Sequence, residues 1–208
     1  MPLADLRGAL PPVPGGAVPK RRREFAAGRA CALRALEQLG IAPEAAAVGV
    51  GAGGAPAWPE GVVGSISHGG ALAWAAVARE RDAAALGIDM EPVMSAARAE
   101  RLCKRIAAPA ELSLVAGASG LGREAALTLI FSAKESLFKA LYPQVGRVVD
   151  YLEACVVAVD AGAGRLRLRL NTRWSHTWPA ASELDGRFLV AEGRVDTAIV
   201  LARRSEAL

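Results

Sequence analysis

Two long stretches with helical periodicity are each followed by a group of short apolar runs, and this order limits the folds open to the chain. The first predicted helix begins in the basic cluster at residues 20–23 and ends at Gly40, and the second runs from about Gly122 to Pro143. The apolar runs after each helix have the length of strands and are separated by turns that contain glycine. A helix followed by strands, twice over, predicts an α+β fold made of two similar halves with a cleft between them.

The chain has 208 residues and is 52% hydrophobic, which is sufficient for a folded core in each half. A segment from Ala96 to Ala116 has helical character but is interrupted by Pro109, and we expect it to carry the crossing between the halves. The predicted parts are an N-terminal extension at 1–20, an N-terminal half at 21–105 and a C-terminal half at 106–208.

The beginning of the chain shows no basic region followed by an apolar segment, so we expect a protein that is not secreted and is cytoplasmic. Charged residues, glycine or proline interrupt every apolar run before it reaches the length of a membrane span. We therefore expect no membrane partner.

Acidic side chains close one of the apolar runs, in the sequence LGIDMEP. Asp89 and Glu91 are two residues apart, so on a strand they point to the same face. Two such carboxylates repel each other unless a cation or hydrogen-bond donors lie between them. The alternative is a strand end whose acids are simply hydrated.

Other polar residues with possible chemical roles lie in two further segments. In FSAKESLFKALYP, Glu135 and Lys139 are four residues apart and share one face of the second helix, where an ordinary surface pair is the alternative. His68 ends the run GSISH, and a lone histidine is often structural or exposed. Three carboxylates, a histidine and a lysine together suit a Mg²⁺-assisted phosphoryl reaction, although spacing alone does not show that they converge.

Two other enzyme classes are disfavoured by their missing motifs. Neither Ser65 nor Ser67 lies in a G-x-S-x-G elbow, which disfavours a serine hydrolase of that type. The chain also lacks the G-x-x-x-x-G-K-[ST] loop of phosphate-binding nucleotide folds.

The formal net charge of +4 suggests an acidic partner, such as nucleic acid, a phosphate or an acidic protein. In the first helix, Arg22 and Arg29 are seven residues apart and share a face, with Arg21 at its edge, so they could bind a phosphate. A solvated helix start is the alternative. A basic nucleic-acid-binding module is the alternative function, but only 5% of the residues are aromatic and no binding motif is recognisable.

Taken in order, GVVGSISH, LGIDMEP and FSAKESLFKA resemble the three signature blocks of the 4′-phosphopantetheinyl transferases, in the subgroup with siderophore-synthase and actinobacterial members. The segments RRREFAAGRACALRAL and PAWPEG resemble that subgroup too, so the similarity covers Arg21 to Tyr142. The resemblance implies a pseudo-twofold monomer of two α+β halves with coenzyme A in the cleft. It also implies transfer of phosphopantetheine from coenzyme A to a serine of an acidic acyl or peptidyl carrier protein, with release of adenosine 3′,5′-bisphosphate and no nucleic-acid partner.

The resemblance implies a role for each block residue. Asp89, Glu91 and Glu135 would hold Mg²⁺ against the pyrophosphate of coenzyme A. The implied catalytic residues are Glu135, Lys139 and His68, and whether Glu135 or Glu91 is the general base stays open. The implied coenzyme A contacts are Arg21, Arg29, Ser67, His68 and Lys139.

Lys134 is also a residue of the third block, next to Glu135. The side chain of Lys134 would point elsewhere on the helix than that of Glu135. Where related chains often carry a basic residue before the P-x-W-P element, this chain has Gly53 and Gly54. We therefore expect the grip on the 3′-phosphate to be weaker, or to be supplied by the basic cluster at residues 20–23.

Overall fold

The computed structural model describes residues 18–42, 46–69 and 72–203. The described residues form two compact units: unit 1 comprises those up to residue 86 and from residue 201 on, and unit 2 comprises residues 87–200. The described residues form helices and antiparallel strand pairs, which confirms the predicted α+β class. The predicted boundaries after residues 20 and 105 stay a prediction.

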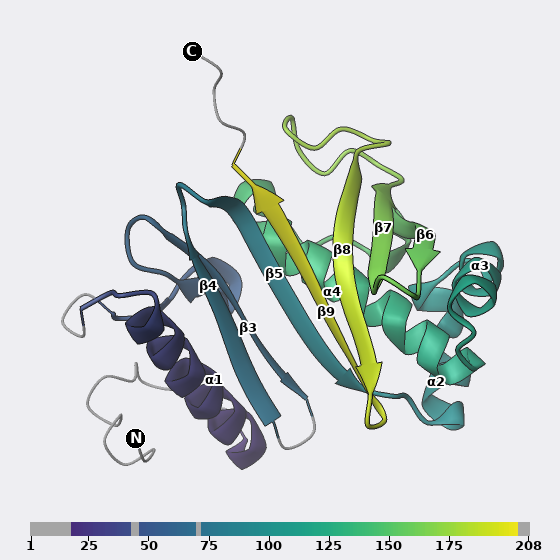
Figure 1. Ribbon diagram of the computed structural model, residues 1–208, viewed down its shortest axis with the longest axis horizontal. Coiled ribbons are helices and arrows are strands. Elements are labelled where there is room, and N and C mark those ends of the chain that lie inside the picture. The colour runs from purple at the N-terminus through teal and green to yellow at the C-terminus, as the bar shows by residue number, and fades with distance from the viewer. Residues whose placement is uncertain (1–17, 43–45, 70–71, 204–208) are drawn as a thin grey trace. The chain divides into compact units, whose positions relative to one another are not determined.

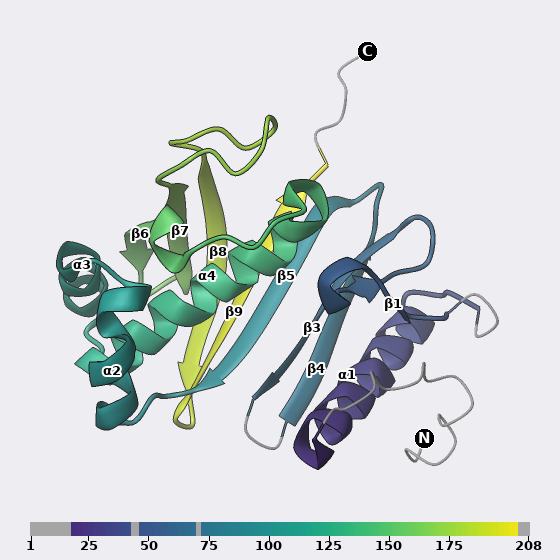
Figure 2. The same cartoon turned by 180° about the vertical axis from the view of Figure 1, so that it is seen from behind.

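In unit 1, one long helix packs along an antiparallel hairpin, as Figures 1 and 2 both show. In the hairpin, residues 62–69 pair with residues 72–79 in unbroken register. A second, two-residue strand pair lies in the connection before the hairpin. The elements are α1 (Pro19–Gln38), β1 (Gly49–Val50), η3 (Ala52–Gly54), β2 (Pro56–Ala57), β3 (Val62–Gly69) and β4 (Leu72–Arg79).

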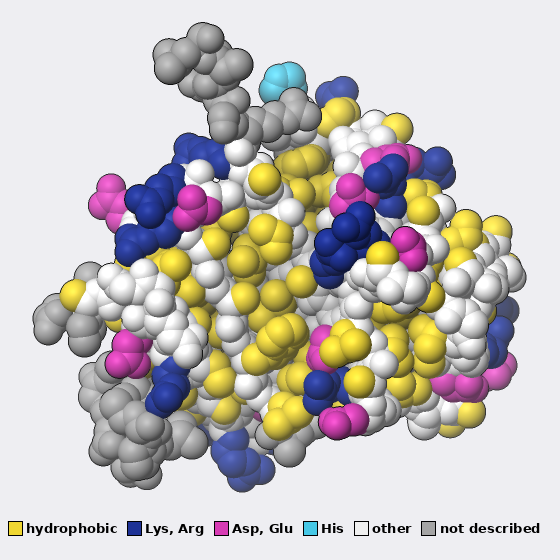
Figure 3. All heavy atoms as spheres, in the orientation of Figure 1, with side chains coloured by type: hydrophobic (Ala, Val, Ile, Leu, Met, Phe, Trp, Pro, Cys, Tyr) yellow, Lys and Arg dark blue, Asp and Glu magenta, His cyan; other side chains and the backbone are white. Residues whose placement is uncertain are grey.

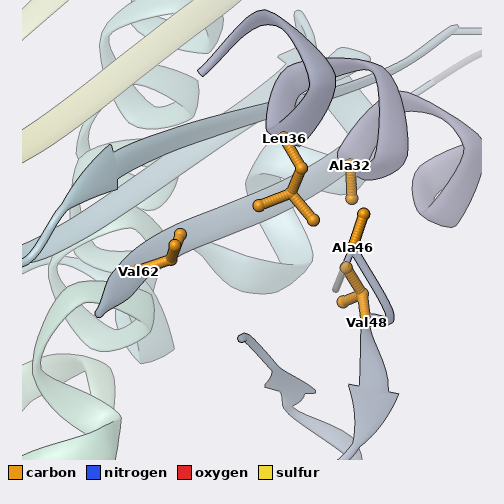
Figure 4. Close-up of a cluster of buried hydrophobic side chains, with 5 residues drawn as sticks. All are labelled: Ala32, Leu36, Ala46, Val48 and Val62. Atoms are coloured by element: carbon orange, nitrogen blue, oxygen red, sulfur yellow. The ribbon is translucent and has the colours of Figure 1, made fainter. Parts of the chain in front are cut away.

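Helix α1 presents small and apolar side chains to the rest of unit 1. Pro19 occupies its first turn, where a missing N–H has no structural cost, and Gly40 ends it with a φ of 76°. Ala32 and Leu36 pack with a buried group from the following connection and β3, shown in Figure 4: Ala46, Val48 and Val62. A Cβ at Gly28 would lie 2.7 Å from Ile66, so the close approach of α1 to β3 needs this glycine.

Unit 2 contains most of a five-stranded sheet, whose strand order is β5-β9-β8-β7-β6. Helix α4 crosses one face of this sheet, as seen in Figure 2, and α2 and α3 pack against α4. Strand β5 begins in unit 1 and continues into unit 2. The elements are β5 (Ala83–Pro92), α2 (Ala96–Ile106), α3 (Pro109–Ser119), α4 (Arg123–Val145), η4 (Tyr151–Glu153), β6 (Ala154–Asp160), β7 (Arg165–Leu170), β8 (Glu183–Ala191) and β9 (Arg194–Ala202).

The two predicted proline breaks have different outcomes. Pro109 does interrupt the helical segment, because it begins α3 after α2 has ended. The prediction that Pro143 stops the second helix is wrong, because α4 continues through it to Val145 and ends at Gly146 in the left-handed conformation. Pro143 lies in the last turn, where its missing N–H removes one helical hydrogen bond and leaves the remaining turns intact.

The face of the sheet opposite α4 carries charged side chains among hydrophobic ones, as Figure 3 shows. The alternation in RLRLRL explains this, since the leucines of β7 are buried while its arginines are outside. Arg167 donates to Asp185 at 2.7 Å on this face. Among the described helices, none alone is long and apolar enough to cross a membrane, and α3 with α4 meets that length and composition only as a pair bent by 109°.

Candidate active site

The glycine of LGIDMEP allows strand β5 to lie directly on helix α4. A Cβ at Gly87 would be 2.0 Å from the carbonyl oxygen of Ser136 and 2.6 Å from the nitrogen of Ala140. No other residue type fits between the two backbones without moving them. This close approach sets the predicted carboxylates of β5, Asp89 and Glu91, beside the face of α4 that carries the third block.

Asp89 and Lys139 form the shortest ion pair of the site. The Nζ atom of Lys139 donates to Asp89 Oδ1 at 2.7 Å and to the carbonyl oxygen of Ile88 at 3.1 Å. The Asp89 side chain is almost fully buried, and that of Lys139 is partly exposed. A charged pair of this kind fixes the lysine against the strand.

Glu135 accepts a hydrogen bond from the hydroxyl of Tyr151 at 2.5 Å. The ring of Tyr151 also packs against Phe131 of α4, with 5.4 Å between the centroids. Burial, followed by the hydrogen bond to Glu135, raises the pKa of Tyr151 far above its usual value, so the phenol keeps its proton. Tyr151 lies outside the three blocks, so nothing in the sequence pattern predicted its contact with Glu135.

The short connection that carries Tyr151 is itself held by Glu153. Both carboxylate oxygens of Glu153 accept from the guanidinium of Arg147, at 3.1 and 2.8 Å. Asp150 and Glu153 also form a capping box around η4. The hydrogen bonds from Arg147 are the main cause that lowers the pKa of Glu153 to about 2.

Glu91 lies where negative charge is most concentrated. Burial, followed by the charges of Asp89 and Glu135, raises its pKa to about 7, while Arg98 and Lys139 oppose the shift. Arg98 comes from α2, lies 3.6 Å from the Glu91 carboxylate and places its guanidinium 5.8 Å from the ring centre of Phe131. Arg98 also lies outside the three blocks, so its contact with Glu91 was not predicted.

The donor set of this cluster suits a hard cation. Three carboxylates supply the oxygen ligands that Mg²⁺ prefers, and the raised pKa of Glu91 shows that their charges interact. Within the described part of the chain, however, no three such side chains are gathered as ligands of one ion. Instead, each carboxylate has its own partner: Asp89 contacts Lys139, Glu91 contacts Arg98 and Glu135 contacts Tyr151.

In unit 1, His68 lies near the end of β3 and contacts two residues of α1. Arg21 Nη1 is 2.9 Å from His68 Nε2, and Glu24 Oε2 is 3.8 Å from His68 Nδ1. Ser67 is buried and pairs with Trp74 across the hairpin. Because side chains alternate along a strand, Ser67 and His68 point to opposite faces of β3.

Arg29 lies in a different environment from Arg21. Its side chain is buried, its Nη2 donates to the carbonyl oxygen of Gly49 at 3.0 Å, and its guanidinium lies 4.8 Å from the ring centre of Phe25. Burial lowers the pKa of Arg29. The structure therefore places Arg21 beside His68 and Arg29 in the interior of unit 1.

The two glycines before the P-x-W-P element have a local cause. Gly53 and Gly54 have φ angles of 62° and 81°, a backbone conformation that strongly favours glycine. The backbone of the turn at η3 thus explains the choice of glycine at both positions.

Lys134, next to Glu135 in the chain, points away from the carboxylate cluster, as predicted. Its Nζ atom is buried and donates to Glu111 Oε2 at 2.9 Å and to the carbonyl oxygen of Ile106 at 2.7 Å. Glu111 Oε1 accepts from the backbone N–H of Val156 at 2.7 Å. Lys134 thus links α4 to α3 and, through Glu111, to β6.

A cavity of about 160 Å³ lies beside Glu135 in unit 2. Its wall is mostly apolar and includes Phe138, Val148, Val149, Tyr151 and Trp174. The cavity therefore adjoins the carboxylate of Glu135 with a surface suited to an apolar chain.

The structure brings the predicted residues together within each unit. Asp89, Glu91, Glu135 and Lys139 form one group in unit 2, and Arg21 and His68 form another in unit 1.

Comparison with known families agrees with the sequence blocks. The 4′-phosphopantetheinyl transferase N-terminal domain matches residues 15–78, and the 4′-phosphopantetheinyl transferase superfamily matches residues 85–193. The chain belongs to the 4′-phosphopantetheinyl transferases, which confirms the predicted family and the predicted enzyme class. Proteins of this family act on coenzyme A and on carrier proteins.

Individual relatives extend the match over most of the chain. The 4′-phosphopantetheinyl transferase Svp of Streptomyces mobaraensis is 42% identical over 188 residues, which cover 89% of this chain and 74% of Svp. PptT of Mycobacterium tuberculosis is 34% identical over 197 residues, covering 91% and 83% of the two chains. Enterobactin synthase component D of Escherichia coli K12 is 44% identical over 121 residues, covering 58% and 55%. None of these matches supports the alternative of a nucleic-acid-binding module.

Proposed function

We propose that this protein transfers the 4′-phosphopantetheine arm of coenzyme A to a serine of an acyl or peptidyl carrier protein, in a Mg²⁺-dependent reaction that releases adenosine 3′,5′-bisphosphate. One observation carries the proposal: Asp89, Glu91 and Glu135 form an interacting group of carboxylates, with Lys139 bound to its buried member. Such a group suits a reaction at a pyrophosphate.

In this proposal Asp89, Glu91 and Glu135 hold Mg²⁺, which when bound supplies positive charge to the pyrophosphate. The serine oxygen attacks the β-phosphorus, and the bond from that phosphorus to the bridging oxygen breaks. Lys139 stabilises the charge that develops on the departing bisphosphate, with His68 as a further phosphate contact.

The proton of the serine passes to a carboxylate, for which Glu135 and Glu91 are the two candidates. Glu135 is oriented by Tyr151, and the pKa of Glu91 is about 7, close to a typical working pH. Glu91→Gln and Glu135→Gln distinguish them, because only loss of the base should abolish the ascending limb of the pH–rate profile.

The coenzyme A contacts are also proposals. Arg21 is the exposed arginine beside His68 and is our candidate for the adenosine 3′-phosphate, whereas Arg29 and Ser67 are buried and would act from within unit 1. The apolar cavity beside Glu135 would receive part of the pantetheine arm.

We propose a cytoplasmic monomer whose partner is an acidic carrier protein, since the net charge of +4 favours such a partner. Enterobactin synthase component D is named for siderophore synthesis, so carriers of siderophore synthesis are among the candidates, with those of fatty acid, polyketide and non-ribosomal peptide synthesis.

The test is intact-mass analysis of candidate apo carriers incubated with the protein, coenzyme A and Mg²⁺. One added phosphopantetheine on the carrier is the expected result. Asp89→Ala should abolish the transfer, while Glu100→Ala, on the exposed side of α2, serves as the control and should leave it unchanged. Full activity of Asp89→Ala would overturn the proposed metal site.

A further inference from the structure

Glu24 of α1 lies among three basic groups, one of which comes from a different element. Its carboxylate oxygens are 3.8 Å from Lys20 Nζ, 3.9 Å from Arg21 Nη1 and 3.8 Å from His68 Nδ1. The first two contacts follow from helical spacing. The contact with His68 joins α1 to β3, and at 24% exposure the Glu24 side chain is much less exposed than those of Lys20 and Arg21.

The contact between Arg21 and His68 defines the tautomer of the imidazole. A guanidinium has only donors, so at 2.9 Å from Arg21 Nη1 the Nε2 atom of His68 must accept. A neutral imidazole carries its single proton on the other nitrogen. The Nδ1–H of His68 therefore faces the carboxylate of Glu24.

We propose that Glu24 is a positioning residue for His68, which it holds with Nδ1–H toward its own carboxylate so that Nε2 is the atom presented to a substrate phosphate. This inference rests on the proposed function, in which His68 contacts a phosphate of coenzyme A. At 3.8 Å the Glu24 carboxylate is within ion-pair range of Nδ1, so its negative charge favours a proton on Nδ1 and adds to the preference set by Arg21 at Nε2.

A phosphate can take the place of the Arg21 guanidinium at His68 Nε2 only if His68 gains one proton. A phosphate oxygen accepts hydrogen bonds, so it cannot bind an Nε2 atom that also accepts. Nε2 therefore takes a proton from solvent as the phosphate displaces the guanidinium, and His68 becomes a cation that donates from both nitrogens. The negative charge of Glu24 at Nδ1 stabilises that cation.

Two groups on the strand and helix beside His68 carry no charge near pH 7. Its register partner on β4 is Ala73, which carries no charge. The thiol of Cys31 on α1 donates to the carbonyl oxygen of Ala73, and burial raises the pKa of this thiol, so it remains neutral near pH 7.

Imidazole ¹⁵N NMR tests the inference without any transfer reaction. The chain has two histidines, so loss of one set of signals in His68→Gln assigns the spectrum. We expect the ligand-free protein, at a pH where His68 is neutral, to show Nδ1–H with an unprotonated Nε2, and Glu24→Ala to show a weaker preference, because Arg21 still donates to Nε2. An Nε2–H tautomer in the wild-type protein would overturn the proposal.

Coenzyme A binding tests whether His68 becomes a cation when a phosphate binds and whether Glu24 stabilises that cation. In the wild-type protein we expect both nitrogens of His68 to become protonated when coenzyme A is added. Glu24→Gln, which removes the charge and keeps the shape, should weaken coenzyme A binding about tenfold, the equivalent of one pKa unit. Glu37→Gln, at an exposed position of the same helix, is the matched control and should leave binding unchanged.

The outcomes separate the two proposals. Equal coenzyme A affinities of the wild-type protein and Glu24→Gln would overturn the role of Glu24. Absence of coenzyme A binding by the wild-type protein would instead overturn the proposed function, while the tautomer of the ligand-free protein would still decide whether Glu24 positions the ring.

Discussion

Replacing Lys134 with methionine would leave the carboxylate of Glu111 buried without its cation. Both side chains are almost completely inaccessible, with exposures of 3% for Lys134 and 4% for Glu111. Burial lowers the pKa of Lys134 and raises that of Glu111, so the loss of hydration outweighs the mutual attraction for each group. The pair is therefore costly to break but is not a large source of stability in itself.

We expect Lys134→Met to lose about 3 to 5 kcal/mol, the usual cost of removing one partner from a buried pair. For a protein of this size, that loss lowers the melting temperature by about 6 to 20 °C. The carbonyl oxygen of Ile106 also loses the bond that it accepts from Lys134, which favours the upper part of the range.

The double variant Lys134→Met with Glu111→Gln isolates the buried charge as the cause. The glutamine oxygen can still accept from Val156, as Glu111 does now, while no charge remains in the interior. We therefore expect the double variant to recover most of the stability that Lys134→Met loses. Urea denaturation of the wild-type protein, both single variants and the double variant gives the coupling energy.

The pH dependence of Lys134→Met gives a second measure of the same charge. A carboxyl group whose pKa is raised on folding contributes stability that is present below its unfolded value of about 4.5 and is lost as the pH rises through the folded value. Without the positive charge of Lys134, the pKa of Glu111 is raised further. The stability deficit of Lys134→Met should therefore be smaller at pH 5 than at pH 8.

Two results would refute this account of Lys134. One is a loss below about 1 kcal/mol in Lys134→Met, the range expected of an exposed pair. The other is a double variant no more stable than the single one. Because Lys134 points away from Glu135, transfer activity per folded molecule should survive in Lys134→Met at low temperature, and its loss would show a catalytic role.

Gly87→Ala should destabilise the fold by about 3 kcal/mol or more, because its Cβ would meet the backbone of α4. Gly117→Ala is the control: the space around this residue of α3 is open, so the variant should be more stable by up to about 1 kcal/mol. Urea denaturation measures both changes. Tyr151→Phe should lower kcat about tenfold or more with little change in KM for coenzyme A, since it removes only the donor that orients Glu135; an unchanged kcat contradicts this. The pKa of Glu153 is depressed to about 2, so its stabilisation is present above pH 4.5 and is lost as the pH falls toward 2. The difference in melting temperature between the wild-type protein and Glu153→Gln should therefore be largest near neutral pH and should close in acid.

The sequence predicted those parts of the site that depend on local periodicity. Asp89 and Glu91 do lie in one strand, where a period of two sets them on the same side. Glu135 and Lys139 lie in one continuous helix, as their spacing requires.

The partners of these residues could not be predicted, because they come from distant segments. Nothing in the spacing relates Tyr151 to Glu135 or Arg98 to Glu91, since both contacts depend on how η4 and α2 pack against α4. The arginines of α1 show the same limit. Helical spacing relates Arg22 to Arg29, but only packing decides that Arg29 is buried against Gly49.

The energetics of Glu91 explain why so many donors surround the cluster. A rise in its pKa from 4.5 to about 7 corresponds to about 3 kcal/mol between the two protonation states. Compared with the unfolded chain, the folded protein therefore favours the protonated form of Glu91. This contribution to stability is present below pH 4.5 and is lost as the pH rises through 7. Arg98 and Lys139 reduce the penalty without removing it. The fold thus maintains a group of carboxylates at an energetic cost that a purely structural sheet edge would not require, because hydrated acids at such an edge would keep ordinary pKa values.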